Sequence, residues 1–83
     1  MDKRILLIED DPILSRLVAQ QLRSLGHEVT QVGGWKDADA YLAAHEPHLI
    51  ITDVKLPDGD SLARLPALVG VQPVIILTAY GSV

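Results

Sequence analysis

Three runs of aliphatic residues, each about the length of a strand, constrain the fold of this chain more than any other feature. The runs are residues 4–9 (RILLIE), 48–53 (HLIITD) and 73–78 (PVIILT). Their central residues are continuously aliphatic and do not alternate with polar ones. Such runs are typical of strands that are buried on both faces, as in a parallel sheet covered by helices.

The segment after the first run has the signals of a helix over residues 12–25. Asp11 is a residue type that caps helix N-termini, and Pro12 suits the first helical position. Apolar residues then recur at helical spacing, and Gly26 is a suitable stop.

The remaining segments continue the alternation. Residues 28–32 (EVTQV) predict a more polar strand, and residues 35–45 predict an alanine-rich helix. Residues 56–60 (LPDGD) have the chemistry of a turn. Residues 61–70 predict a short helical segment that Pro66 kinks or shortens.

This alternation predicts an α/β fold, with one domain over residues 1–83. The expected architecture is a flavodoxin-like, doubly wound parallel sheet with strand order 2-1-3-4. Ligands of such sheets bind beyond the carboxyl ends of the strands, at the point where the winding reverses.

Acidic residues stand at that point. Asp10 and Asp11 follow the first run, and Asp53 ends the second run, which is the third predicted strand. The predicted strand order 2-1-3-4 makes these two strands neighbours. Three carboxylates in one crevice are costly unless a cation joins them, and oxygen ligands suit Mg²⁺ or Mn²⁺ rather than zinc. Taken alone, Asp11 before Pro12 is typical of a helix cap. Glu9 is expected to lie next to the metal ligands without binding the metal itself.

Composition excludes several classes of function. The chain has 83 residues, 48% of them hydrophobic, and a formal net charge of −4. Its lysines and arginines are scattered, which argues against a nucleic-acid-binding surface. It has no cysteine and no apolar run approaching the roughly 18 residues of a membrane span. We therefore expect a cytoplasmic protein without a membrane partner.

The motifs IEDDP, ITDVKLPDGDSL and ILTAYGS resemble, in order and spacing, those of the receiver domains of two-component response regulators. The resemblance covers essentially the whole chain and implies a signalling module rather than an enzyme. The ending LTAYGSV resembles receivers of the nitrogen-regulator type, which precede an ATPase that activates alternative-sigma-factor transcription.

The resemblance implies a role for individual residues. Asp53 would take a phosphoryl group from a sensor histidine kinase. Asp10, Asp11 and Asp53 would hold Mg²⁺ (or Mn²⁺) together with the backbone carbonyl of Lys55. The Thr78 hydroxyl and the Ala79 amide would contact the phosphoryl group.

The sequence also departs from the family pattern, because it ends just after the fourth predicted strand. The last strand and the last two helices are missing, with the lysine and the aromatic switch residue of that strand. Lys55 lies on the wrong side of Asp53 to replace the lysine. The expectation is a truncated receiver that cannot complete its output switch and that self-associates, most simply as a homodimer.

Two alternative functions stay open at this point. One is an association module whose phosphorylation site is vestigial. The other is a fragment of a haloacid-dehalogenase-type phosphohydrolase. That family would require an acid two residues after its nucleophile, where this chain has Lys55.

Overall fold

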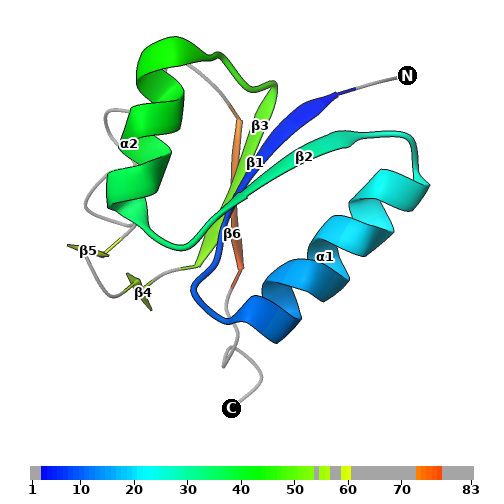
Figure 1. The fold of residues 1–83 in the computed structure, drawn as a ribbon, viewed down its shortest axis with the longest axis horizontal. Helices are drawn as coiled ribbons and strands as arrows, with labels where there is room; N and C mark the ends of the chain where they lie inside the picture. The colour runs from blue at the N-terminus through cyan, green and yellow to red at the C-terminus, as the bar shows by residue number, and fades with distance from the viewer. Residues whose placement is uncertain (1–2, 54, 57–58, 61–72, 78–83) are drawn as a thin grey trace.

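The computed structural model describes residues 3–53, 55–56, 59–60 and 73–77. Within them, four parallel strands form one sheet in the order β2-β1-β3-β6, and helices α1 and α2 lie on opposite sides of it (Figure 1). Counted along the chain, this is the order 2-1-3-4, so the predicted α/β parallel sheet is confirmed.

The predicted elements are found with ends shifted by at most one residue. The sheet and its helices are β1 (Arg4–Ile8), α1 (Pro12–Ser24), β2 (Glu28–Val32), α2 (Trp35–Ala44), β3 (Leu49–Asp53) and β6 (Val74–Leu77). The predicted turn carries a small antiparallel pair, β4 (Lys55–Leu56) with β5 (Gly59–Asp60). The helical segment predicted over residues 61–70 lies outside the described residues.

Alternation along the strands divides the core into two layers. Leu6, Ile8 and Ile50 pack against Trp35 and Ala38 of α2. The intervening residues Ile5, Leu7 and Ile51 pack with Val29 and Ala19 on the side of α1. Both faces of the central strands are therefore buried, which explains why their sequences are continuously apolar.

Helix α1 is closed at both ends by local contacts. The Asp11 side chain accepts a hydrogen bond from the Ile13 N–H at 2.9 Å, and Pro12 occupies the first helical turn. At the other end Gly26 has φ 93°, a left-handed conformation that suits glycine. The His27 N–H donates to the Leu22 carbonyl at 3.2 Å, so the chain turns directly into β2.

Helix α2 depends more on packing than on caps. Its N-cap is Gly34, which offers no side-chain hydrogen bond, whereas Trp35 in the first turn is almost fully buried. The His45 N–H donates to the Tyr41 carbonyl at 2.8 Å where the helix ends. Neither helix within the described residues is long and apolar enough to cross a membrane.

Candidate metal and phosphoryl site

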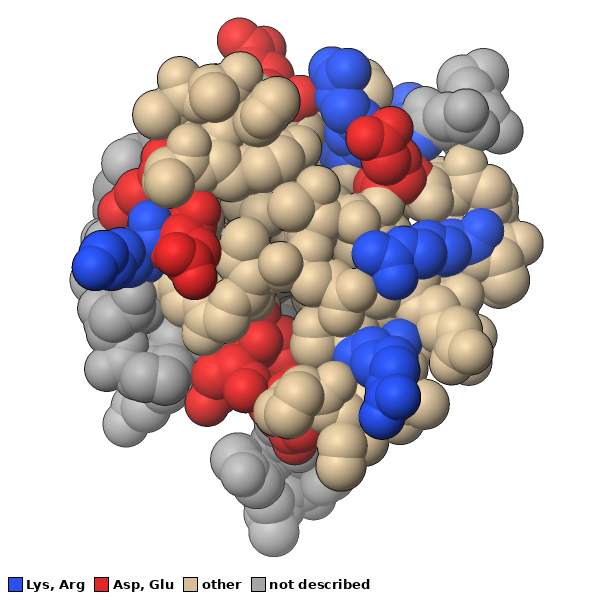
Figure 2. All heavy atoms as spheres, in the orientation of Figure 1, with Lys and Arg blue, Asp and Glu red and all other residues tan. Residues whose placement is uncertain are grey.

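The candidate site is built where β1 and β3 end. These strands are parallel neighbours, with Ile8 of β1 paired to Thr52 of β3. The next residues along the two strands are Glu9 and Asp53, which brings their side chains together. Figure 2 shows acidic side chains gathered at the lower edge of the molecule, the edge at which β1 and β3 end in Figure 1.

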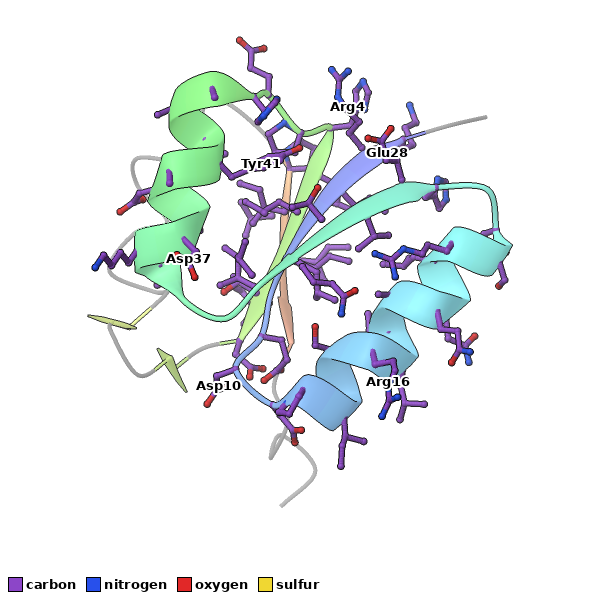
Figure 3. All side chains as sticks on the ribbon, in the orientation of Figure 1. Arg4, Asp10, Arg16, Glu28, Asp37 and Tyr41 are labelled. Atoms are coloured by element: carbon purple, nitrogen blue, oxygen red, sulfur yellow. The ribbon has the colours of Figure 1, made fainter. Side chains whose placement is uncertain are left out.

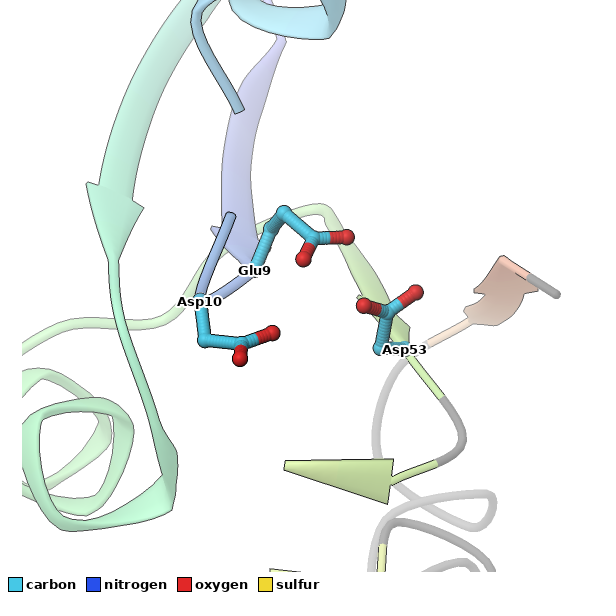
Figure 4. Close-up of side chains that lie close together, drawn as sticks. All are labelled: Glu9, Asp10 and Asp53. Atoms are coloured by element: carbon cyan, nitrogen blue, oxygen red, sulfur yellow. The ribbon is translucent and has the colours of Figure 1, made fainter. Parts of the chain in front are cut away.

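Three carboxyl groups converge at this edge. One carboxylate oxygen from each of Glu9, Asp10 and Asp53 lies within 4.8 Å of the others (Figure 4). Glu9 and Asp53 are only 4% and 8% exposed, whereas Asp10 is open to solvent. Asp10 also lies at the opposite end of the sheet from Arg4 and Glu28 (Figure 3). The site therefore has two buried acids and one that faces solvent.

The clustering of the three acids and the burial of Glu9 change the pKa of Glu9. Burial raises the pKa of Glu9 from its ordinary value of 4.5 to about 7. The adjacent Asp53 carboxyl contributes to this higher pKa, because two anions repel and a proton on Glu9 can be shared. The N–H of Asp11 acts in the other direction, by donating to Glu9 Oε2 at 3.0 Å.

Two oxygen atoms of the site lack hydrogen-bond donors within the described part of the chain. They are Oε1 of Glu9 and Oδ1 of Asp53, and both are buried. Buried carboxylate oxygens are normally paired, since an unpaired one loses its hydration without compensation. A hard divalent cation such as Mg²⁺ takes oxygen ligands and keeps several waters, so this donor set fits it.

Asp11 takes a different position from the one its sequence suggested. Its Oδ1 accepts from the backbone N–H groups of Ile13 at 2.9 Å and Leu14 at 3.4 Å, and so caps α1. Asp11 is not among the three clustered acids, and Glu9 is. The sequence offered one signal for Glu9, because Glu9 and Asp53 are the acids that end the runs RILLIE and HLIITD.

The other predicted site residues are less fully described. Lys55 begins β4 and pairs with Asp60 of β5, but no contact between its carbonyl and the three acids is described. Thr78 and Ala79 lie outside the described residues. The roles of these three residues stay predictions.

Comparison with known proteins identifies the family. Residues 5–83 match the response regulator receiver domain. The chain belongs to the response regulator receiver domain family. Receivers are signalling modules rather than enzymes, and this membership weighs against the phosphohydrolase alternative.

Relatives of this receiver include two transcriptional regulatory proteins. PhoP of Escherichia coli is 34% identical over 82 residues, which cover 95% of this chain and 37% of PhoP. PdtaR of Mycobacterium tuberculosis is 33% identical over 83 residues, which cover 96% of this chain and 40% of PdtaR. The receiver therefore spans only about two fifths of the length of these relatives.

Solved structures share the fold of this receiver. The response regulator PhyR from Brucella abortus is 27% identical with a TM-score of 0.84, over 96% of this chain and 35% of PhyR. The MaeR response regulator bound to beryllium trifluoride is 28% identical with a TM-score of 0.81, over 93% of this chain and 67% of MaeR.

Proposed function

We propose that this receiver accepts a phosphoryl group on Asp53 from a sensor histidine kinase, with Mg²⁺ held by Glu9, Asp10 and Asp53. The observation that carries the proposal is the cluster of three carboxylate oxygens, in which Asp53 Oδ1 is buried and lacks a donor among the described residues. Family membership supports the same chemistry.

Asp53 suits the role of nucleophile better than its two neighbours. Glu9 is engaged through Oε2 with the Asp11 amide, and its high pKa keeps part of it protonated near neutral pH. Asp10 faces solvent, where water competes for its oxygens. Asp53 faces these two acids from the end of a buried strand (Figure 4), which would fix its approach to a phosphodonor.

The proposed transfer moves the phosphoryl group from the kinase histidine to Asp53 and needs no further reactant. A carboxylate oxygen of Asp53 forms a bond to phosphorus as the bond from phosphorus to the kinase imidazole nitrogen breaks. The electron pair of that bond stays on the imidazole, and Asp53 becomes an acyl phosphate. When bound, Mg²⁺ would neutralise charge on the phosphoryl oxygens during the transfer.

Acetyl phosphate labelling followed by mass spectrometry tests this proposal. We expect a Mg²⁺-dependent, hydroxylamine-sensitive phosphoryl group on Asp53, which Asp53→Asn abolishes because an amide is not a nucleophile. Asp37→Asn on α2 is the matched control and should label as the wild type does. A label on another residue, or one independent of Mg²⁺, would refute the assignment.

Beryllium trifluoride offers a second test that needs no covalent step. A related structure, MaeR, is described as bound to this phosphoryl-like group. We expect the same anion to bind here only with Mg²⁺ present and to shift the backbone NMR signals of β1 and β3. Asp53→Asn should remove these shifts.

The wider role of the receiver is also part of the proposal. Its relatives PhoP and PdtaR are named as transcriptional regulators, which supports a role in transcriptional control. An output of the nitrogen-regulator type rests on the ending LTAYGSV alone. A cytoplasmic location would follow from a kinase partner whose phosphohistidine is inside the cell. Fusion of the full reading frame to a reporter would test the output class.

Self-association is proposed separately. Ile75, on the outermost strand of the described sheet, is 48% exposed, and an exposed apolar strand favours pairing with a second chain. Sedimentation at micromolar concentration should reveal a dimer. A monomer that melts cooperatively would remove the association-module alternative.

A further inference from the structure

Thr52 is a fully buried polar residue beside the proposed phosphoacceptor. It is the fourth residue of β3, and its side chain is 0% exposed. The neighbouring strand residues Leu6, Ile8 and Ile50 are equally buried but apolar. Packing alone would favour valine at this position, since valine has the same β-branched shape without a hydroxyl that must be satisfied.

The Thr52 hydroxyl contacts the backbone of Asp53. Its Oγ1 donates to the Asp53 carbonyl oxygen at a distance of 3.0 Å, and the contact is buried. Asp53 is the last residue of β3, so this carbonyl belongs to the peptide group by which the chain leaves the strand. The hydrogen bond therefore restrains the backbone at the residue that carries the proposed nucleophile.

The backbone matters here because one oxygen of the Asp53 side chain lacks an anchor of its own. Oδ1 of Asp53 has no hydrogen-bond partner among the described residues. No described donor fixes this oxygen, so the backbone of Asp53 contributes to the direction of the carboxylate toward Glu9 and Asp10 (Figure 4). A restraint on the Asp53 carbonyl is a restraint on that direction.

We propose that Thr52 is a positioning residue, whose hydroxyl holds the Asp53 peptide so that the carboxylate faces Glu9 and Asp10. The proposal rests on the proposed function, in which Asp53 is the phosphoacceptor. The role assigned to Thr52 is indirect. It acts through Asp53, because transfer to phosphorus requires the attacking oxygen to be in line with the leaving group.

The experiment compares variants that differ only in the hydroxyl. Thr52→Val keeps the shape and removes the hydroxyl, whereas Thr52→Ser keeps the hydroxyl and removes a methyl group. Thr30→Val, on β2, is the matched control for the same substitution elsewhere in the sheet. Should Thr52→Val fail to fold, Thr52→Ser against Thr52→Ala makes the same comparison, since both lose the methyl group.

Two measurements are made on each folded variant: the rate of Asp53 labelling at saturating acetyl phosphate, and Mg²⁺ affinity by NMR titration without any phosphodonor. We expect Thr52→Val to lower the saturated labelling rate on the order of tenfold, as small misplacements of a nucleophile do. It should also weaken Mg²⁺ binding. Thr52→Ser should restore both quantities, and Thr30→Val should change neither.

The outcomes separate the two proposals. Normal labelling and Mg²⁺ affinity in Thr52→Val would overturn the role of Thr52 and leave the function of Asp53 intact. Absence of any label on wild-type Asp53 would overturn the function, and Mg²⁺ affinity would then decide the role of Thr52 alone. Equal loss in Thr52→Ser and Thr52→Val would show that the methyl packing, not the hydroxyl, is what matters, and would also overturn the inference.

Discussion

The backbone N–H of Asp11 donates a hydrogen bond to Oε2 of Glu9, with 3.0 Å between the two atoms. This contact turns the two acids in different directions. Glu9 is held with the buried site, whereas the side chain of Asp11 caps α1. Two acidic residues that are two positions apart in the sequence therefore serve the site and the helix separately.

The first prediction distinguishes these roles by substitution. Glu9→Gln should lose most of the Mg²⁺ affinity, because the amide can still accept from the Asp11 N–H but carries no charge. Asp11→Asn should bind Mg²⁺ almost normally, since asparagine caps helices as well as aspartate does. Asp11→Ala should cost about 1 kcal/mol of unfolding free energy, the usual effect of a lost cap.

Calorimetric titration and urea unfolding measure both effects. Asp10→Asn serves as the reference for loss of an exposed site acid. An Asp11→Asn variant that loses as much Mg²⁺ affinity as Glu9→Gln would return Asp11 to the ligand set that its sequence suggested.

The second prediction is the pH dependence of the metal-free protein. The folded-state pKa of Glu9 is about 7, above its ordinary value of 4.5, so between these values the folded state binds the proton and the unfolded state does not. Stability should therefore be highest below pH 4.5 for this group and should fall as the pH rises toward 7. The full shift corresponds to about 3 kcal/mol, as one pKa unit is worth about 1.4 kcal/mol.

Urea unfolding in EDTA between pH 5 and 8 measures how stability changes with pH. The difference between wild type and Glu9→Gln gives the contribution of Glu9, because the other titrating groups contribute to both proteins. Wild type and Glu9→Gln that change in parallel across this range would contradict the prediction.

The third prediction is that Mg²⁺ stabilises the fold, and more so at pH 8 than at pH 5. A ligand that binds only the folded state adds about 2.7 kcal/mol at a concentration of 100 times its Kd. Protons compete for the same carboxylates, so the effect should weaken in acid. Thermal melts with Mg²⁺ and with EDTA give the shift at each pH. Asp10→Asn should reduce the shift, and a shift that is equal in both proteins would place the cation elsewhere.

The fourth prediction concerns the opposite end of the sheet. The Arg4 N–H donates to Nδ1 of His48 at 2.9 Å, and the His48 N–H donates to the Arg4 carbonyl at 2.7 Å. His48→Ala should lower the free energy of unfolding by up to about 1 kcal/mol, as loss of one solvent-exposed hydrogen bond does. His48→Asn should retain most of the stability that His48→Ala loses, because the asparagine Oδ1 can replace the histidine Nδ1 as the acceptor.

Exchange of the Arg4 amide hydrogen is the local measurement for this contact. It should quicken in His48→Ala and stay near the wild-type rate in His48→Asn, with Mg²⁺ affinity unchanged in both. Equal exchange in all three proteins would mean that Nδ1 does not hold this amide.

The order of the elements could be predicted from the sequence because each carries a local signal. Three apolar runs mark the inner strands, and Asp11, Pro12 and Gly26 mark the ends of α1. These signals depend on short-range sterics and on burial, and both act on few neighbours. The sheet order followed from the general winding of such folds rather than from any single residue.

The membership of the site was harder to predict, because it depends on contacts between strands. The predicted residues Asp10 and Asp53 lie in the cluster of acids, whereas the cluster includes Glu9 and not the predicted Asp11. The residues Glu9, Asp10 and Asp11 have similar chemistry, and the sequence does not show at which of them β1 ends. That point is decided by the pairing of Ile8 with Thr52, a contact between residues 44 positions apart.

The register between β1 and β3 also limits how this protein can change over evolutionary time. Side chains alternate between faces along a strand, so a single-residue insertion or deletion inside β1 would move Leu6 and Ile8 to the wrong layer. It would also carry Glu9 away from Asp53. Point substitutions at the acids can be tested by selection one at a time, whereas a change in strand length alters the core and the site together. We therefore expect related genes to vary in length in their connecting loops and to keep the lengths of β1 and β3 constant.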